Sequence, residues 1–485
     1  MAEARLKEII KVRKEKIEKL KALGVNPFPS KLKGERKDVK DARKLDGKDV
    51  SIAGRLMALR GHGNITFADL KDESGKIQLF FQKDKLEKNW KVLELLDIGD
   101  FIWVKGKVFK TEAGEVTVNV SDLQLLTKSI LPLPSTWHGL KNEEARYRQR
   151  YVDFVLNEDL KDLFRKKAMF WQSMREFLLD KGFLEVETPV LENTAGGADA
   201  NPFITHHEAL DIDLYLRISM GELWQKRLMV AGFEKTFEIG RQFRNEGISR
   251  EHLQDYTQME FYWAYANYED SMRLVEEMYK HVAQKTFGKL DFKIDNFDVD
   301  LGKKWERIDY VTIVKEKTGI DVSKAESKEI IKKLEELKVE HKKGDSKGRL
   351  IDSLWKFVRK NIAGPAFLVG HPVEVSPLAK RKEGKEGFVE RYQVILAGSE
   401  MGNGYSELND PIDQKERFES QQKMRDEGDL DAQMHDEDFV RALEYGMPPT
   451  TGFGVSERLF SFLADLSIRE TVLFPLLKPE GKDLN

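Results

Sequence analysis

Between residues 237 and 265 the chain alternates apolar and polar side chains in two runs that a polar loop separates. In the first run Phe237 and Ile239 share one side and Glu238 lies on the other, because successive side chains of a strand point to opposite faces. The pattern predicts a hairpin with one apolar face and one polar face, which is either solvated or part of a site. In the second run Met259, Phe261, Trp263 and Tyr265 alternate with Gln258, Glu260 and Tyr262.

The loop of this hairpin, residues 245–257, carries groups that suit a nucleoside triphosphate. A guanidinium binds phosphate oxygens in a bidentate way, and an aromatic ring stacks on a base. A Walker A sequence, the main rival phosphate cradle, is absent. The polar groups at and beside the loop are Arg244, Glu246, Arg250, His252 and Tyr256.

Composition narrows the class of protein. A chain of 485 residues predicts two or three domains. The absence of cysteine excludes disulfides, thiolate catalysis and cysteine–zinc sites, and it fits a reducing cytosol. No apolar run approaches the ~20 residues that span a bilayer, and no secretory signal is recognisable. We therefore expect a cytoplasmic protein without a membrane partner. A net charge of −3 gives no global basic field, and no DNA partner is expected.

Three regions differ in pattern. Residues 3–23 predict a basic amphipathic helix, which is either solvated or packed, or else contacts RNA phosphates. Short β-forming runs with glycine and aspartate turns predict a small barrel over about 45–130. A segment rich in lysine and glutamate, about 320–347, predicts a surface-exposed helical insertion. The expected division is 1–44 as an N-terminal helical extension, 45–135 as the barrel, 136–160 as an interdomain linker and 161–485 as the domain with the insertion.

Three motifs, in order, resemble those of the class II aminoacyl-tRNA synthetases. Gly182–Pro189 and the helix before it look like motif 1, Phe243–Glu246 with Gln258–Glu260 looks like motif 2, and Gly452–Arg458 looks like motif 3. The resemblance implies an α+β fold: an OB-fold anticodon-binding barrel, then a catalytic domain with an antiparallel sheet flanked by helices. It also implies a homodimer with motif 1 at the interface.

Further blocks resemble the lysine–tRNA ligases in particular. The resemblance implies ATP-dependent formation of lysyl-adenylate from L-lysine and its transfer to tRNA(Lys). An aspartate– or asparagine–tRNA ligase of the same subclass is an alternative, although an aspartate site needs cations where this chain has Glu222 and Glu407. A catalytically weakened tRNA-binding paralogue, or a paralogue that lysylates a protein, also stays open. The blocks are 139–151, 196–207, 216–227, 372–379 and 402–409.

The resemblance also implies roles for individual residues. Arg244 and Arg458 are the expected catalytic residues, with Arg244 bridging the lysine carboxylate and the α-phosphate. A cationic substrate stripped of water needs buried carboxylates around it. The expected ATP site is Arg244, Glu246, His252, Tyr256, Glu400 and Arg458, and the expected lysine site is Gly197, Glu222, Arg244, Glu260, Tyr262, Asn403, Tyr405 and Glu407.

Two departures from the family pattern concern this site. The family holds Mg²⁺ with two glutamates; Glu400 matches one, and Gln393 stands at the other position. Because a neutral oxygen is a poorer ligand for a hard cation, we expect Mg²⁺ to bind weakly, mainly through Glu400 and the ATP phosphates. In motif 3 Val455 occupies the usual glycine position, which puts Gly454 in doubt as a pocket residue.

The barrel resembles the anticodon-binding type. By that resemblance Phe67 stacks on a base and Gln78 reads the central uridine, while Arg55 and Glu115 are further anticodon candidates. RNA readers favour splayed bases in loops, as in an anticodon. Alternation predicts that Ile77, Leu79 and Phe81 face the barrel interior and that Gln78 and Phe80 face outward.

Overall fold

The chain folds into two compact units, Met1–Leu156 and Asn157–Asn485. The structure is a computed structural model that describes residues 2–134, 140, 142–342, 344–427 and 432–480. Of the expected linker, residues 136–139 and 141 lie outside the described residues, as do 343 of the expected insertion and 428–431 and 481–485 of the expected catalytic domain. The four-part division of the chain stays a prediction.

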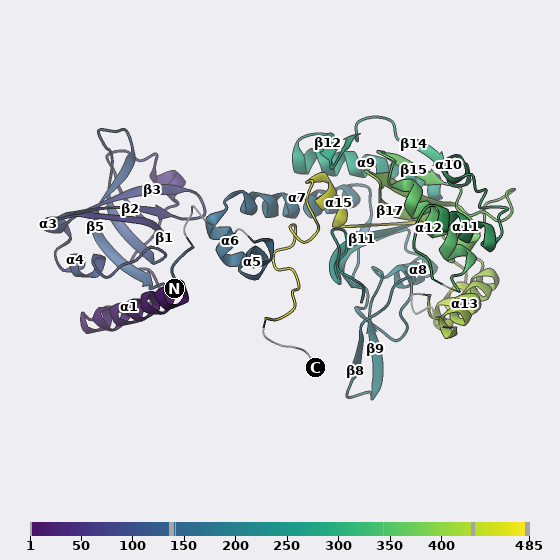
Figure 1. Ribbon diagram of the computed structural model, residues 1–485, viewed down its shortest axis with the longest axis horizontal. Helices are drawn as coiled ribbons and strands as arrows, with labels where there is room; N and C mark the ends of the chain where they lie inside the picture. The colour runs from purple at the N-terminus through teal and green to yellow at the C-terminus, as the bar shows by residue number, and fades with distance from the viewer. Residues whose placement is uncertain (1, 135–139, 141, 343, 428–431, 481–485) are drawn as a thin grey trace. The chain divides into compact units, whose positions relative to one another are not determined.

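The first unit is a closed five-stranded barrel with the strand order β1-β2-β3-β5-β4 (Figure 1). Ile77, Leu79 and Phe81 are fully buried inside it, which confirms the predicted inward face. A turn closes β2 onto β3, where Asp72 Oδ1 accepts the backbone N–H groups of Ser74 and Gly75 at 2.8 and 3.0 Å. The strands are β1 Asp49–His62, β2 Ile65–Lys71, β3 Lys76–Gln82, β4 Phe101–Lys110 and β5 Val116–Thr127.

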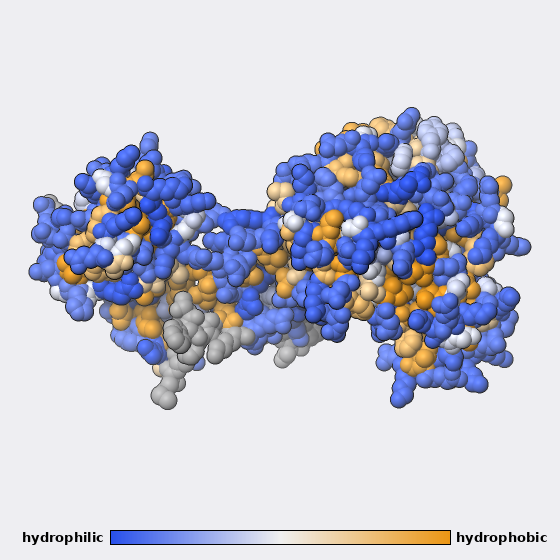
Figure 2. All heavy atoms as spheres, turned by 90° about the horizontal axis from the view of Figure 1, so that it is seen from above, coloured by the Kyte–Doolittle hydropathy of each residue, from blue (hydrophilic) through white to orange (hydrophobic). Residues whose placement is uncertain are grey.

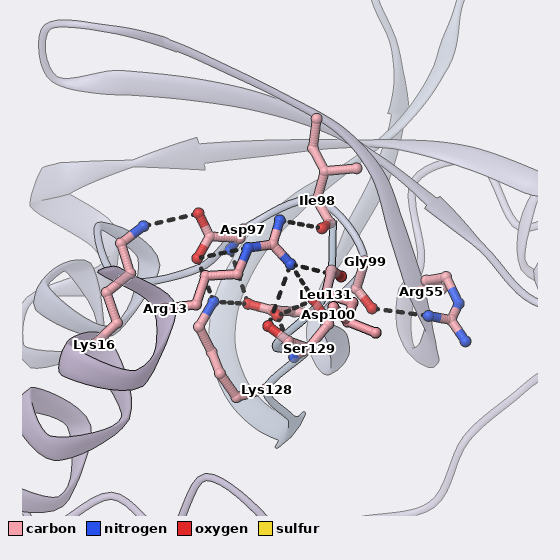
Figure 3. A network of polar contacts seen from close by, with 10 residues as sticks. All are labelled: Arg13, Lys16, Arg55, Asp97, Ile98, Gly99, Asp100, Lys128, Ser129 and Leu131. Atoms are coloured by element: carbon pink, nitrogen blue, oxygen red, sulfur yellow. Dashed lines mark hydrogen bonds and ion pairs between the residues drawn. The ribbon is translucent and has the colours of Figure 1, made fainter. Parts of the chain in front are cut away.

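Helix α1, Ala2–Ala22, is fixed to this barrel by both apolar and charged contacts. Leu20 is fully buried, and Arg13 is only 7% exposed. The Arg13 guanidinium donates to Ser129 Oγ at 2.7 Å and to the carbonyl oxygens of residues 98, 129 and 131 (Figure 3). Lys16 binds Asp97 at 2.8 Å. Two cations of the predicted basic helix therefore serve packing on the barrel.

The same network contains a fully buried lysine. Lys128 Nζ lies 2.5 Å from Asp97 and 2.7 Å from Asp100, and Asp100 is itself fully buried (Figure 3). A buried ammonium is tolerated because both carboxylates offset its lost hydration. The short helices of this unit are α2 Val39–Ala42, α3 Lys83–Leu86, α4 Lys88–Leu93, α5 Glu143–Arg148 and α6 Arg150–Leu156, of which the last two occupy the expected linker.

The second unit is built on an eight-stranded sheet of order β14-β15-β16-β17-β18-β11-β10-β6. The pairs β10–β6 and β14–β15 are parallel and the other pairs are antiparallel. The predicted hairpin is confirmed as β10 and β11, and the segment Gly182–Pro189 contains only the short strand β6. The strands are β6 Leu184–Glu185, β10 Lys235–Phe243, β11 Asp255–Ala264, β14 Glu306–Asp309, β15 Ala366–Val369, β16 Arg391–Leu396, β17 Ser399–Ser406 and β18 Thr450–Ser456.

One face of this sheet is covered by α7, Asp159–Asp180, and α9, Tyr268–Phe287. Helix α9 begins at Asn267, whose side chain accepts backbone N–H groups of the first turn, and ends at Gly288 in the left-handed conformation. Phe237, Phe261 and Phe453 of the sheet pack into this core. Because side chains alternate along each strand, the intervening polar residues point to the opposite face, where the functional site lies.

Smaller elements surround that opposite face. In the segment 320–347 the predicted helix is confirmed as α11, but its apolar side is not exposed: Ile330 and Leu334 are fully buried against α12. Strands β8 and β9 form a hairpin that projects from this unit (Figure 1). These elements are β7 Leu191–Glu192, β8 Ile204–His207, β9 Ile212–Leu216, α8 Glu222–Val230, β12 Asp291–Ile294, β13 Phe297–Asp300, α10 Tyr310–Thr318, α11 Ser327–Glu336, α12 Lys347–Arg359, η1 Val373–Val375, α13 Pro411–Asp426, α14 Glu437–Glu444 and α15 Arg458–Leu463.

The face drawn in Figure 2 is mostly hydrophilic, with apolar residues gathered in separate patches. Charged residues make up 34% of the chain, which accounts for the polar cover. Among the described residues, no helix is both long enough and apolar enough to cross a bilayer.

Candidate functional site

A cavity of about 620 Å³ opens on the polar face of the large sheet. It is lined by side chains of β11, β17 and β18, by the start of α8 and of α15, and by α12. The predicted polar face of the hairpin contributes Gln258, Glu260 and Tyr262 to its wall. Glu238, on the same face of β10, is instead buried in an ion pair with Arg217 at 2.6 Å.

Arg244 follows the last residue of β10 and faces the cavity. Its Nε donates to the carbonyl oxygen of Ile218 at 3.2 Å, and its guanidinium lies 5.9 Å from the centre of the Tyr256 ring. Burial disfavours its charge, but Tyr256, Glu246 and Glu260 raise its pKa above the usual value. The side chain is thus a permanently charged fork beside an aromatic ring.

The hairpin loop brings its predicted polar groups to the cavity with one exception. Glu246 and His252 are exposed and line the cavity, and His252 Nδ1 lies 2.7 Å from the hydroxyl of Ser249. Surrounding protein atoms displace part of the water around the His252 ring, and Arg458 adds positive charge nearby. Both lower the pKa of His252, so that it is neutral near pH 7. Arg250 turns away and pairs with Asp295 at 2.9 Å.

Arg458 is the first residue of α15 and reaches the cavity across the sheet. One of its Nη atoms donates to the carbonyl oxygen of Glu400, and the other lies 3.6 Å from Glu251. Its Nε is buried without a hydrogen-bond partner among the described residues. A buried donor without a partner costs free energy unless a ligand satisfies it.

Three carboxylates meet at one end of the cavity: Glu222, Glu260 and Glu407, which are 6%, 5% and 1% exposed. Glu260 accepts the N–H of Met220 and the hydroxyl of Tyr262, each at 3.0 Å. Burial and the neighbouring Glu222 raise the pKa of Glu260 to about 7. Burial also raises the pKa of Glu407, although Lys226 opposes that shift. We call these three residues the carboxylate end.

Lys226 is a site residue that the sequence did not reveal. It is fully buried on α8, with Nζ 2.8 Å from Glu222 and 2.5 Å from Glu407. A glutamate and a lysine four residues apart on a helix ordinarily form an exposed surface pair, so their spacing gave no sign of burial. Here the pair faces inward, and Lys226 supplies an internal positive charge that holds two of the three carboxylates.

Asn403, Tyr405 and Glu407 all line the cavity, as their alternation predicted. Tyr405 donates its hydroxyl to Glu222, and Asn403 accepts the Nε of Arg391 at 2.8 Å. The asparagine is thereby held in place with its amide N–H groups available to an acceptor in the cavity.

Glycines keep the carboxylate end open. Gly197 has φ +86°, and a Cβ there would lie 2.8 Å from the Ser219 side chain. A Cβ at Gly452 would clash with Glu407. Gly454, which the sequence left in doubt, lines the cavity opposite Glu260, while Val455 is buried in the core. The unusual motif 3 therefore still leaves glycine on the cavity side of β18.

Glu400 and Gln393 do not form a two-carboxylate metal site. The indole N–H of Trp355 can only donate, so it fixes the Gln393 carbonyl oxygen at 3.1 Å. The Gln393 amide N–H then donates to Glu400 at 2.8 Å. The Gln393 carbonyl oxygen already accepts from Trp355, and the Gln393 amide nitrogen is a donor. Neither group is suited to bind a hard cation. Among the described residues, no three or more His, Asp or Glu side chains form a group that could hold a metal ion.

On the barrel, Phe67 and Gln78 lie on the outer face. Phe67 is half-buried rather than part of the core, and its ring lies 4.9 Å from that of Phe80. Gln78 accepts the hydroxyl of Thr117 at 2.9 Å. Adjacent half-buried rings on the outer face of a sheet suit stacking of unpaired bases.

The two further anticodon candidates are placed differently. Glu115 is exposed at the start of β5, two residues before Thr117, and lies 3.6 Å from Arg43. Arg55 pairs with Lys71 in the β1–β2 ladder, four positions along β2 from Phe67. Its guanidinium covers the Phe101 ring at 4.2 Å, so it is not brought together with Phe67 and Gln78.

Comparison with known proteins supports this arrangement. The family described as tRNA synthetases class II (D, K and N) matches residues 142–478, and the OB-fold nucleic acid binding domain matches residues 50–126. Similar curated proteins are the lysine–tRNA ligases of Thermoanaerobacter sp. (strain X514) and Carboxydothermus hydrogenoformans, each 46% identical. The first comparison covers 98% of this chain and 97% of the relative, and the second covers 99% and 100%.

A more distant relative is similar over the same length. The lysine–tRNA ligase of Thermosipho africanus is 43% identical over 99% of this chain and 98% of the relative. Matches at this level over nearly whole chains, together with the two family matches, settle the relationship: the chain belongs to the class II tRNA synthetases of the aspartate, lysine and asparagine group.

Proposed function

We propose that the chain joins L-lysine to tRNA(Lys) in an ATP-dependent reaction that passes through lysyl-adenylate. The observation that carries this proposal is the meeting of three buried carboxylates, Glu222, Glu260 and Glu407, in one cavity with Arg244. The relatives at 43–46% identity are lysine–tRNA ligases, which fits the same conclusion.

Charge counting explains the choice of amino acid. With all three carboxylates ionised, as bound lysine requires, the ammonium of Lys226 leaves two negative charges at the carboxylate end. Lysine brings two ammonium groups. We assign the ε-ammonium to Glu260, Tyr262 and Glu407 and the α-ammonium to Glu222 and the Gly197 backbone. A neutral or acidic amino acid would leave these carboxylates without a partner, which is costly in a buried site.

The remaining groups suit ATP and the acid end of lysine. We assign Arg244 to the lysine carboxylate and the α-phosphate, with Asn403 beside it and Tyr405 fixed by its bond to Glu222. Tyr256 stacks on the purine, Glu246 accepts from the adenine amino group, and Arg458 covers the other face of the ring. His252 meets the terminal phosphates.

The two steps then need no protein nucleophile. A carboxylate oxygen of lysine attacks the α-phosphorus, and the bond to pyrophosphate breaks. The terminal ribose hydroxyl of tRNA next attacks the lysyl carbonyl carbon, and AMP leaves with the bonding electrons. Catalysis rests on alignment of the reactants and on fixed positive charge where negative charge develops.

Magnesium enters this scheme with ATP. Glu400 is the one carboxylate at the expected position, and the Gln393 amide is turned toward it as a donor. We therefore propose weak binding of Mg²⁺ by the protein itself, with the phosphates as the main ligands.

For the tRNA, we propose that Phe67 stacks on an anticodon base and that Gln78 reads the central uridine edge. Glu115 lies near enough to take part, whereas the contacts of Arg55 give it a structural role as well. RNA readers favour bases splayed from a loop, which matches half-buried rings on the outer face of the barrel.

We also propose a cytoplasmic homodimer. The projecting β8–β9 hairpin carries Ile204 and Leu210, which are 65% and 63% exposed, and the edge strand β6 carries Leu184, which is 49% exposed. Apolar side chains on a hairpin and a sheet edge favour burial against a second copy. Sedimentation of the purified chain tests this: a mass of one chain at micromolar concentration contradicts it.

The function is tested by ATP–pyrophosphate exchange with purified protein. Exchange should depend on lysine and stay near background with aspartate or asparagine. Added tRNA(Lys) should then accept the lysyl group. Exchange driven by aspartate would overturn the assignment, and lysine-dependent exchange without tRNA charging would indicate the paralogue that acts on another acceptor.

A further inference from the structure

The last residue of α12, Arg359, presents a guanidinium to the catalytic cavity. Its side chain is 18% exposed, and one Nη atom lies 3.8 Å from Oε2 of Glu400. At 3.8 Å the contact is an ion pair without a close hydrogen bond. The guanidinium therefore keeps donors for a further acceptor, and no step of the proposed reaction has used it.

The neighbouring Gln393 explains why the Arg359 guanidinium can lie beside Glu400. Gln393 points its amide N–H at Glu400 because Trp355 of the same helix α12 holds its carbonyl oxygen. Where the family has two carboxylates, this site has one carboxylate, one neutral donor and one guanidinium. Compared with a pair of glutamates, the site has one negative charge fewer, and the Arg359 guanidinium lies beside the remaining carboxylate.

Arg359 also belongs to a cluster of cations on the same wall. His252, Arg359 and Arg458 all line the same cavity. In keeping with this, both arginines lower the pKa of His252, and Arg359 lowers that of Arg458. Glu251 and Glu400 offset part of this charge; Glu251 lies 3.6 Å from Arg458. Like charges repel, so an anion between them would be strongly favoured. The polyphosphate of ATP has the charge and the acceptor oxygens for that space.

We propose that Arg359 binds the β- and γ-phosphates of ATP, and pyrophosphate in the reverse direction, and so supplies from the protein part of the positive charge that a metal between two glutamates would otherwise supply. The proposal rests on the function proposed above. Arg244 is assigned to the α-phosphate, and Arg359 acts on the leaving group. The chain should consequently tolerate low magnesium.

Binding measured without a divalent cation tests this directly. Calorimetric titration in EDTA compares ATP, pyrophosphate and AMP with the wild-type chain and with Arg359→Ala, Arg359→Lys and Lys360→Ala. Arg359→Ala should weaken ATP and pyrophosphate at least tenfold and leave AMP within twofold, and Arg359→Lys should lose less. Lys360 is exposed at the next position and absent from the cavity lining, so Lys360→Ala should change nothing.

Unchanged binding of ATP and pyrophosphate to Arg359→Ala in EDTA would overturn the proposal. An equal loss for AMP would also do so, because the effect would then not depend on the terminal phosphates. If Arg359→Ala does not fold, Arg359→Lys carries the same comparison with the charge kept and the fork removed.

A second measurement separates this proposal from the function on which it rests. In lysine-dependent exchange, Arg359→Ala should raise the magnesium concentration for half-maximal rate and the KM for ATP severalfold, with the KM for lysine unchanged. Gln393→Glu should raise the affinity for magnesium and weaken ATP in EDTA. Absence of exchange with the wild-type chain would end the proposed function, while the EDTA titrations would still decide the role of Arg359.

Discussion

The carboxylate end of the cavity and the wall of Arg244, Arg359 and Arg458, which we call the guanidinium end, satisfy their charges differently. Each carboxylate has a close polar partner in the chain: Glu260 accepts from Met220 and Tyr262, and Glu222 and Glu407 form ion pairs with Lys226 at 2.8 and 2.5 Å. At the guanidinium end, Arg458 has a buried Nε without a partner among the described residues, and the Arg359 ion pair is 3.8 Å long.

The difference shows where each end obtains its selectivity. The buried carboxylate end excludes uncharged side chains, because Lys226 neutralises only part of its negative charge and further positive charge is required. A loosely paired basic wall binds whatever polyphosphate enters, because its donors are already oriented and little reorganisation is needed. The carboxylate end therefore selects the amino acid, and the guanidinium end lowers the barrier of its activation.

The largest expected effect follows from changing the guanidinium end. Arg244→Lys keeps the charge but loses the planar fork, so kcat/KM for lysine-dependent exchange should fall about 10²–10³-fold, the usual cost of removing a transition-state donor. Steady-state exchange assays measure it. Arg241→Lys is the matched control on the same hairpin, because Arg241 pairs with Asp255 and lies outside the cavity lining. A full rate for Arg244→Lys would refute the role of the fork.

The second effect concerns the stability of the carboxylate end. Lys226→Met removes the buried ammonium and leaves Glu222 and Glu407 uncompensated, so the free energy of unfolding should fall by about 3–5 kcal/mol. Urea denaturation measures the change. Lys356→Met breaks a pair of the same helical spacing with Asp352, but at side chains 59% and 37% exposed, and should cost under about 1 kcal/mol. Equal losses for the two variants would show that Lys226 has no special role.

The smallest effect is a pH dependence confined to the carboxylate end. Glu260 has its pKa raised from 4.5 to about 7, so the folded chain keeps a proton that the unfolded chain loses above pH 4.5. Ionised Glu260 is thus a cost to folding that grows as pH rises from 4.5 to about 7. Lysine needs that ionised form, so its KM should be about tenfold higher at pH 6 than at pH 8.

Lysine-dependent exchange across this pH range measures the trend, with the KM for ATP as the internal reference. Glu260→Gln removes one of the two carboxyl groups with a raised pKa, the other being Glu407, so it should weaken the pH dependence while raising the KM for lysine at every pH. A KM for lysine that rises with pH would contradict the assignment of Glu260.

Much of the architecture could be predicted from local pattern. The inward face of β3 and the two faces of the β10–β11 hairpin follow from alternation, which needs no knowledge of the partner strand. The placement of Asn403, Tyr405 and Glu407 follows for the same reason. Residues joined by one strand or one hairpin were therefore the ones that the sequence placed correctly.

What the sequence missed depends on contacts between distant segments. Lys226 belongs to a helical pair that reads as exposed until β17 brings Glu407 against it. The direction of the Gln393 amide is set by Trp355, 38 residues away. Arg359 follows a segment rich in lysine and glutamate. Only the packing of α12 beside the cavity distinguishes Arg359 from an exposed cation such as Lys360. In each case the sequence identifies the polar side chain but not the direction in which that side chain points.

The most direct test of the account is a crystal structure with L-lysine and a non-hydrolysable ATP analogue. We predict the ε-ammonium within hydrogen-bonding distance of Glu260, Tyr262 and Glu407, and the α-phosphate at Arg244. A lysine side chain that lies outside the carboxylate end, with those glutamates bound only to groups of the chain, would contradict it.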